Sequence, residues 1–162
     1  LWKQSDLLVG WIQLVCGEDK TPIVVYGHKD VHMPMAFLAC VKSGRAYVPV
    51  DIGVPRDRVK RIINAVSPRL ILTTEEIAPY EECRMVNITG QPVSGEVLPI
   101  TPADYVREED VYYIIFTSGS TGTLKEVQVT YASPIHFVDW ALTLENCDKK
   151  HRGYLSIRPP FP

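Results

Sequence analysis

Apolar and polar positions follow two alternating patterns along this chain, one helical and one extended. Apolar residues recur every three or four positions in several stretches, which predicts amphipathic helices there. Short runs of β-branched and aliphatic residues lie between them and predict buried strands. The predicted helices cover residues 1–16, 32–43, the segment between Pro55 and Pro68, and 133–142; the predicted strands cover 23–27, 46–50, 70–73, 112–117 and 127–130, with a weaker one at 85–88.

Strands and helices that alternate with short connections are typical of an α/β fold, in which helices flank a mostly parallel sheet. Pro49 lacks the N–H that a strand interior needs, so it predicts an edge strand or a bend at 46–50. Residues 75–83 are ambiguous and could form one helical turn. Residues 90–110 are rich in proline, glycine and acidic residues and are interpreted as a surface connector. The tryptophans Trp2, Trp11 and Trp140 are expected to be packed rather than functional.

Length and composition narrow the function classes. A chain of 162 residues is one domain or a piece of a larger one, and a net charge of -2 favours neither nucleic acid nor an anionic membrane as a partner. No apolar run approaches the roughly 20 residues that span a bilayer. Cys16, Cys40, Cys83 and Cys147 are scattered, which argues against a zinc site and fits reduced thiols in a cytoplasmic protein.

Two clusters of charged or polar residues have an ordinary structural interpretation. His28 and His32 are four residues apart across a loop and a helix start; metal ligation remains an alternative, but solvated histidines are favoured. The helix after Pro55 carries a basic face, for which a solvated surface is favoured over a nucleic-acid contact. That face is made of Arg56, Arg58, Lys60 and Arg61.

One stretch carries a specific chemical signal. The aliphatic and aromatic strand at 112–117 runs into small hydroxylated residues and glycines, and a lysine follows. Consecutive backbone N–H groups in such a turn form a concave anion site, to which hydroxyls and an ammonium group add donors. The candidate nucleotide-binding residues are Thr117, Ser118, Gly119, Ser120, Thr121, Gly122 and Lys125. The spacing is not that of a Walker A loop, and a solvated loop between two strands is the alternative.

Thr-Ser-Gly-Ser-Thr-Gly-x-x-Lys after such a strand resembles the signature loop of the adenylate-forming enzymes, which include acyl-CoA synthetases, luciferases and peptide-synthetase adenylation domains. The family pattern continues Pro-Lys-Gly, whereas this chain has Leu124, Lys125 and Glu126. Leu124 does not fix φ as proline does, Glu126 takes φ > 0 only at a cost, and its carboxylate would repel a phosphate. We therefore expect these two departures to weaken the site.

A second motif supports the same resemblance. Val41–Asp51, followed by Pro55-Arg56-Asp57-Arg58, resembles the Lys-Ala-Gly-x-Ala-Tyr-Val-Pro-x-Asp and Pro-x-x-Arg motifs of amino-acid adenylation domains. A structural role is favoured for it. His32-Met33, the stretch from Phe37 to Asp51 and Phe137–Trp140 resemble the branch of this family that ligates D-alanine to a carrier protein for teichoic-acid modification.

The resemblance implies a two-step reaction with ATP and Mg²⁺: a small amino acid is adenylated, and the phosphopantetheine thiol of a carrier protein then accepts the acyl group. Thr117 and Ser118 would contact ATP, Gly119 to Gly122 would surround the leaving phosphates, and Lys125 would lie near them. Residues 1–162 would be an incomplete N-terminal portion of the AMP-binding domain. The C-terminal domain would be absent, no catalytic residue would lie in this stretch, and it would be inactive alone. A peptide-synthetase adenylation domain and an inactive relative that serves as an interaction module remain alternatives.

Overall fold

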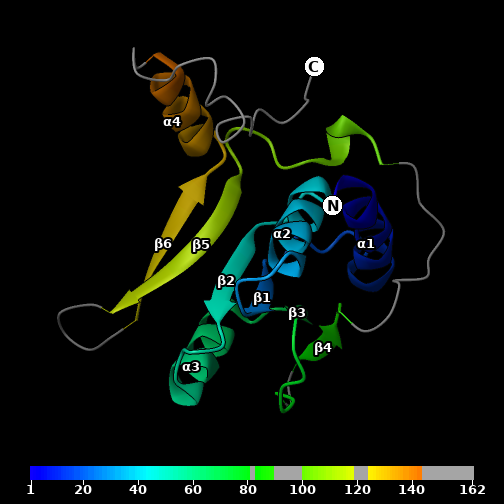
Figure 1. Ribbon diagram of the computed structural model, residues 1–162, viewed down its shortest axis with the longest axis vertical. Coiled ribbons are helices and arrows are strands. Elements are labelled where there is room, and N and C mark those ends of the chain that lie inside the picture. The colour runs from blue at the N-terminus through cyan, green and yellow to red at the C-terminus, as the bar shows by residue number, and fades with distance from the viewer. Residues whose placement is uncertain (81–82, 90–99, 119–123, 144–162) are drawn as a thin grey trace.

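The computed structural model describes residues 1–80, 83–89, 100–118 and 124–143, with Ser118 described by its backbone alone. These ranges contain four α-helices and six strands, which alternate from α1 to β3 (Figure 1). The helices are α1 (Trp2–Cys16), α2 (His32–Lys42), α3 (Arg56–Val66) and α4 (Ala132–Thr143). The strands are β1 (Ile23–Gly27), β2 (Tyr47–Asp51), β3 (Leu70–Thr73), β4 (Arg84–Asn87), β5 (Val111–Ser118) and β6 (Leu124–Thr130).

The six strands form one sheet in the order β4-β3-β1-β2-β5-β6. Every neighbouring pair is parallel except β5 and β6, which are antiparallel and form a hairpin at one end of the sheet. The predicted α/β fold with a mostly parallel, helix-flanked sheet is confirmed. Each predicted helix and strand is also present, with boundaries shifted by up to three residues.

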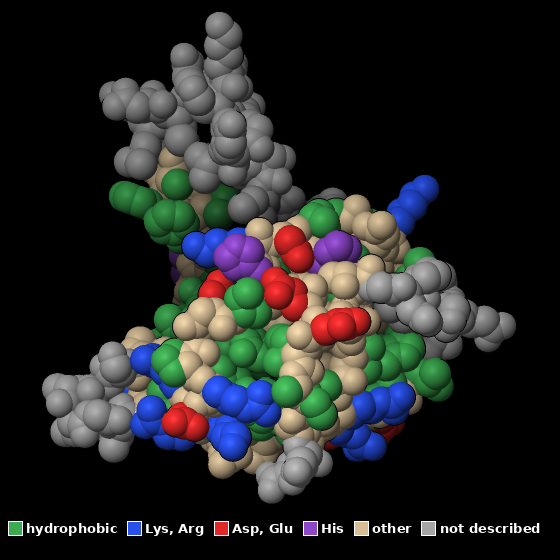
Figure 2. All heavy atoms as spheres, turned by 60° about the horizontal axis from the view of Figure 1, so that its bottom comes forward, with side chains coloured by type: hydrophobic (Ala, Val, Ile, Leu, Met, Phe, Trp, Pro, Cys, Tyr) green, Lys and Arg blue, Asp and Glu red, His purple; other side chains and the backbone are tan. Residues whose placement is uncertain are grey.

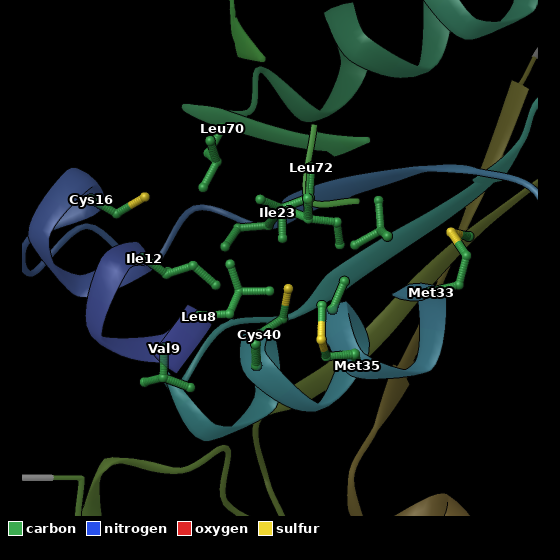
Figure 3. Packing of buried hydrophobic residues seen from close by; sticks show 14 residues of the cluster. Leu8, Val9, Ile12, Cys16, Ile23, Met33, Met35, Cys40, Leu70 and Leu72 are labelled. Carbon is green, nitrogen blue, oxygen red and sulfur yellow. The ribbon is translucent and has the colours of Figure 1, made fainter. Parts of the chain in front are cut away.

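Alternate residues of the central strands enter two different cores, because successive side chains of a strand point to opposite faces. Ile23 and Val25 pack with α1 and α2 on one face, as Figure 3 shows for Ile23 beside Leu8, Ile12 and Cys40. Val24 and Tyr26 pack with α3 on the other face. This two-sided burial explains why β1 and β3 read as continuous apolar runs in the sequence.

The prediction that Pro49 marks an edge strand is wrong, because β2 lies between β1 and β5. The sheet tolerates the proline for a local reason. β2 pairs with β1 along its whole length, but its only register pair with β5 is Tyr47 with Tyr113. The side of β2 that faces β5 therefore carries little of a hydrogen-bond ladder at Pro49, so a missing donor is inexpensive there.

Other expectations also need correction. Trp140 is 57% exposed and Trp2 is 39% exposed, so neither is a core residue, although Trp11 does pack against the core. The described part of 75–83 contains no helix. In the connector, residues 100–110 include only the short 3₁₀ helix η1 (Pro102–Asp104), and residues 90–99 lie outside the described ranges.

The contact between α1 and α2 is built around a buried ammonium group. Lys42 is only 1% exposed, and its Nζ donates to Asp6 Oδ1 at 2.6 Å and to Ser5 Oγ at 2.8 Å. The same Nζ lies 3.3 Å from the centroid of the Trp2 ring. Burial lowers the pKa of Lys42, while the Asp6 carboxylate opposes that shift. The ion pair therefore compensates for a desolvated charge in the helix–helix contact.

We predict that Asp6→Ala destabilises the fold by about 2 kcal/mol, because it leaves the buried ammonium without its carboxylate. Asp6→Ala combined with Lys42→Met should recover most of this loss, since the uncompensated charge is then gone. Urea unfolding of the wild type, both single variants and the double variant measures the coupling. A double variant that is as unstable as the sum of the single ones would contradict the prediction.

Two glycines with positive φ provide a matched comparison. Gly44 has φ of 70°, and a Cβ there would meet the Asp104 carbonyl oxygen at 2.6 Å. Gly17 has φ of 58°, and a Cβ there would meet nothing within 4 Å. Gly17→Ala should cost about 1–3 kcal/mol, because φ of 58° with ψ of -133° is a backbone conformation that residues other than glycine rarely adopt. Gly44→Ala should cost about 2 kcal/mol more, because η1 must move as well. Thermal unfolding of both variants tests this order. Equal losses of stability in the two variants would contradict it.

Candidate functional site

Five parallel strands end at the same edge of the sheet, as parallel strands must. Their last residues are Gly27, Asp51, Thr73, Asn87 and Ser118. Ligands of open α/β sheets bind outside this carboxyl edge. The glycine- and hydroxyl-rich segment leaves β5 here and returns as β6, so the predicted loop joins two strands as expected (Figure 1). Gly119, Ser120, Thr121 and Gly122 lie outside the described residues.

Two of the predicted site residues meet at the open end of the hairpin. Thr117 of β5 pairs directly with Lys125 of β6, and Ser118 pairs with Leu124 as the last pair before the loop. Directly opposed residues of antiparallel strands place their side chains on the same face, about 5 Å apart. Both side chains are exposed. A hydroxyl and an ammonium group therefore stand side by side where the loop begins and ends.

Glu126 lies on the other face of the ribbon. It pairs with Phe116, one position before Thr117, and the side chains of neighbouring strand residues alternate between faces. Its Oε1 accepts a 2.6 Å hydrogen bond from Nε2 of Gln128, which shares its face. The carboxylate is thus directed along the strand and away from the face that carries Lys125. By the same alternation, Glu126 shares its face with the strand position of Ser118 and not with Thr117.

The backbone of the two departing residues is also ordinary. Leu124 and Glu126 belong to β6, and Ser67 is the one described residue other than glycine with positive φ. Glu126 therefore avoids the cost that a positive φ would impose on it. Leu124 is half-buried and packs against the apolar cluster on the α3 face. An apolar side chain at position 124 thus anchors the start of β6.

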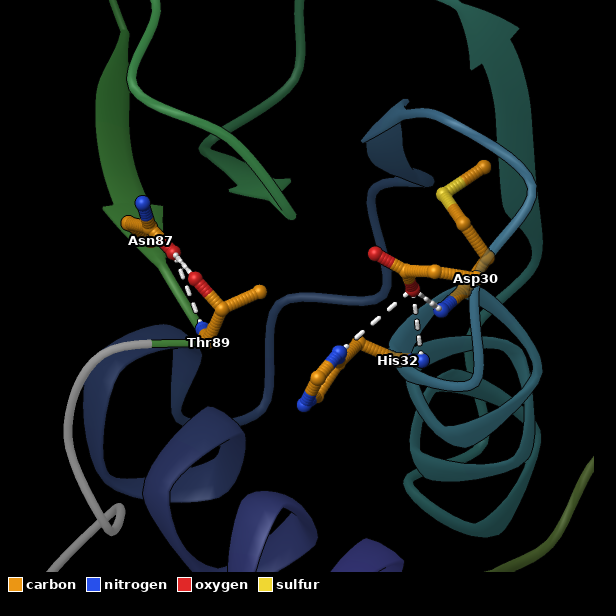
Figure 4. A network of polar contacts seen from close by, with 5 residues as sticks. Asp30, His32, Asn87 and Thr89 are labelled. Carbon is orange, nitrogen blue, oxygen red and sulfur yellow. Dashed lines mark hydrogen bonds and ion pairs between the residues drawn. The ribbon is translucent and has the colours of Figure 1, made fainter.

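Histidine and acidic side chains gather on the same edge, as Figure 2 shows for this face of the molecule. Asp30 Oδ1 accepts hydrogen bonds from the backbone N–H of His32 (2.7 Å) and Met33 (3.3 Å), and so caps α2. His32 Nδ1 lies 3.5 Å from the same oxygen (Figure 4). His28 Nδ1 lies 3.8 Å from Asp51 Oδ2. A capping carboxylate explains this cluster without any metal.

Asn87 and Thr89 close the end of β4 in a similar way. Asn87 Oδ1 accepts from the Thr89 N–H at 2.9 Å and from its hydroxyl at 2.7 Å (Figure 4). Throughout the described ranges, no group of three or more His, Cys, Asp and Glu residues could hold a metal ion. Nor is any helix in those ranges long and apolar enough to cross a membrane.

A hollow of about 240 Å³ lies beside the hairpin, between the end of β2, the start of α3 and the end of β5. Its lining includes Pro49, Asp51, Pro55, Ile62, Phe116 and Arg58. Arg58 Nη2 donates a 3.1 Å hydrogen bond to the carbonyl oxygen of Phe116. Sequence reasoning assigned Arg58 to a solvated basic face and missed this contact. The Pro-x-x-Arg spacing was the available signal, because it places an arginine in the first turn of α3.

The architecture and the motif-bearing hairpin agree with comparisons to known proteins. The family model of the AMP-binding enzymes matches residues 1–161, and the chain belongs to this family. Proteins of this class are the adenylate-forming enzymes that the two motifs indicated.

Within this class, the chain is similar to D-alanine–D-alanyl carrier protein ligases. It is 40% identical over 142 residues to the enzyme of Bacillus licheniformis, an alignment that covers 86% of this chain and 28% of the relative. It is 37% identical over 148 residues to the enzyme of Bacillus mycoides, which covers 88% of this chain and 29% of the relative. The chain therefore spans less than a third of the length of these curated relatives.

Solved structures show the same fold at lower identity. The nonribosomal peptide synthetase FmoA3 in its α-methyl-L-serine-AMP-bound form matches with a TM-score of 0.73 and 20% identity, over 85% of this chain and 15% of that one. The fatty acid AMP ligase from Legionella pneumophila matches with a TM-score of 0.69 and 17% identity, over 85% of this chain and 25% of that one. These two matches show that the chain shares its fold with part of each of these larger proteins.

Proposed function

We propose that the full-length protein that includes this chain is an AMP-forming ligase, which activates D-alanine with ATP and transfers it to the phosphopantetheine of a carrier protein. The observation that carries the proposal is the pairing of Thr117 with Lys125 at the mouth of a hairpin on the carboxyl edge of the sheet. The identity to D-alanine–D-alanyl carrier protein ligases supports the choice of substrate and partner. A role in teichoic-acid modification follows from the same similarity.

In the first step, an oxygen of the amino-acid carboxylate attacks the α-phosphorus of ATP, and the bond from that phosphorus to the pyrophosphate oxygen breaks. Negative charge grows on the departing pyrophosphate. Thr117 and Ser118 would contact the nucleotide, Gly119 to Gly122 would surround the β- and γ-phosphates, and Lys125 would supply a positive charge beside them. Donors held in place before the reaction stabilise this charge most effectively.

In the second step, the carrier thiol attacks the carbonyl carbon of the acyl-adenylate, and AMP leaves with the electrons of the acyl–phosphate bond. Mg²⁺ would supply positive charge that neutralises the phosphates during the first step. Among the described residues of the hairpin, the exposed hydroxyl of Thr117 would be a group able to hold it. We assign no catalytic residue within 1–162, and we expect these residues alone to be inactive.

A peptide-synthetase adenylation domain is the second candidate function. The structural similarity to FmoA3 favours it, since that protein's bound form contains an amino-acid adenylate. Both candidates use the hairpin in the same way and differ in the amino acid. An inactive relative that acts as an interaction module is the third candidate, and the exposed aromatic pair Phe137 and Trp140 on α4 is the feature that favours it.

We predict that Lys125→Ala weakens binding of ATP with Mg²⁺ to the full-length protein about tenfold, because one ammonium group beside a phosphate is worth about 1.4 kcal/mol or more. Glu126→Gln, which changes charge by the same amount on the other face, should alter affinity less than about threefold. Isothermal titration with ATP measures both. Equal effects of opposite sign would mean that the two side chains share the nucleotide site.

Substrate choice is tested separately by pyrophosphate exchange. The full-length protein should exchange labelled pyrophosphate into ATP with D-alanine and far more weakly with L-alanine, because the two differ in the placement of the amino group. The 162-residue chain alone should show no exchange. Preference for an L-amino acid would favour the peptide-synthetase candidate, and no exchange with any amino acid would favour the interaction module.

A further inference from the structure

The β5–β6 hairpin is attached to the parallel sheet at one end only. β5 pairs with β6 from Val111 to Ser118, but it pairs with β2 only at Tyr113, opposite Tyr47. The half of β5 that leads to the loop therefore carries no sheet pairing to the body of the molecule. Figure 1 shows the hairpin diverging from β2 toward the loop. A two-stranded ribbon of this kind is only marginally stable in orientation and shape unless something else holds it.

At its base, the hairpin is held by aromatic rings. Tyr47 stacks on Phe37 of α2 with a centroid distance of 4.3 Å, and it contacts Tyr112 and Tyr113 of β5 at 5.5 and 5.8 Å. Tyr112 also lies 5.1 Å from Tyr131 at the end of β6. Burial raises the pKa of Tyr47, as expected for a ring inside such a cluster. These contacts fix the base but lie at the end of the hairpin away from the loop.

Toward the loop, Phe116 and Leu124 pack against the apolar cluster on the α3 face, and the hydrogen bond from Arg58 to the Phe116 carbonyl adds a polar attachment. Phe116 directly precedes Thr117, so the bond acts one residue from the candidate nucleotide site. The half-buried Arg58 side chain comes from the first turn of α3. The start of α3 is itself fixed, because Asp51 accepts from the Gly53 N–H through Oδ1 (2.8 Å) and from the Val54 N–H through its carbonyl (3.0 Å).

We propose that Arg58 is a positioning residue: it holds the loop end of the β5–β6 hairpin against α3 and thereby sets where Thr117 and Lys125 meet a nucleoside triphosphate. The part that concerns the nucleotide rests on the proposed function, whereas the attachment of the hairpin does not. Arginine suits this task because its long, planar, permanently charged fork makes strong hydrogen bonds to a carbonyl. Lysine is shorter and offers a point charge, so it should substitute only in part.

The test compares Arg58→Ala, Arg58→Lys and Arg61→Ala in the full-length protein. Arg61 is an exposed arginine of the same helix, so its replacement controls for the loss of charge. Hydrogen exchange is followed by mass spectrometry in peptides from 111–118 and 124–130, with peptides from β1 and β3 as an internal reference. Arg58→Ala should speed exchange in the hairpin about tenfold and leave β1 and β3 unchanged, because the lost bond involves a charged donor.

The second readout is the KM of pyrophosphate exchange. Arg58→Ala should raise the KM for ATP about tenfold while the KM for the amino acid stays within about twofold, and Arg58→Lys should lie between it and the wild type. A smaller folded fraction would instead lower the rate and leave both KM values unchanged. If Arg58→Ala does not fold, the same two measurements on Arg58→Lys decide between the outcomes: hydrogen exchange in the hairpin and the KM for ATP.

The proposal would be overturned if hydrogen exchange in the hairpin were as slow in Arg58→Ala as in Arg61→Ala. An unchanged KM for ATP in Arg58→Ala would also overturn it. Failure of the wild-type protein to bind ATP would instead refute the proposed function and the nucleotide part of this inference. The exchange data would then still decide whether Arg58 holds the hairpin.

Discussion

The orientation of a strand pair that leaves its sheet is the constraint on which the candidate site depends. A parallel sheet positions its strands through continuous hydrogen-bond ladders, but the ladder between β2 and β5 is limited to the pair Tyr47 and Tyr113. Beyond this point, side chains have to do what the ladder does elsewhere. The aromatic cluster around Tyr47 and the hydrogen bond from Arg58 are each worth on the order of 1–3 kcal/mol. Together these contacts stabilise one orientation of the hairpin by a few kcal/mol, so the loss of one of them should be detectable.

This constraint gives the second sequence motif a physical meaning. Its residues look unrelated in the sequence, yet each connects β2 and its flanking helices to a neighbouring part of the fold. Lys42 joins α2 to α1, Tyr47 joins β2 to the base of the hairpin, and Asp51 shapes the turn before α3. Arg58 then reaches the strand that carries the first motif. Within this segment, Tyr47 and Arg58 contact the hairpin directly, whereas Lys42 joins α1 and α2.

Local signals predicted most of the fold because local physics determines it. The apolar runs of β1 and β3 are buried on both faces, so their sequence pattern reports the sheet directly. The prediction from Pro49 was wrong because a proline is tolerated inside this sheet only where β5 diverges from β2. The position of that divergence cannot be read from the residues around Pro49. The prediction that Trp140 is packed was wrong for a different reason. Helical spacing shows that apolar residues lie on one face of a helix, but it does not show that another element covers that face. Thr117 and Lys125 were chosen from the motif alone, and the hairpin register places them together. The contact of Arg58 with a backbone carbonyl leaves no trace in the sequence of β5, since any residue at 116 offers the same acceptor.

The departures of this chain from the family pattern are compatible with a working hairpin. A proline and a glycine around Lys125 would suit a chain that turns there. Here β6 begins at Leu124, so both flanking positions are extended, a conformation that leucine and glutamate adopt without strain. The substitutions also improve the strand: Leu124 adds an apolar contact on the α3 face, and the carboxylate of Glu126 bonds to Gln128. For the proposed ligase, this extended and packed start of β6 would keep Lys125 opposite Thr117, and charge on a leaving group is stabilised best by groups that do not have to move.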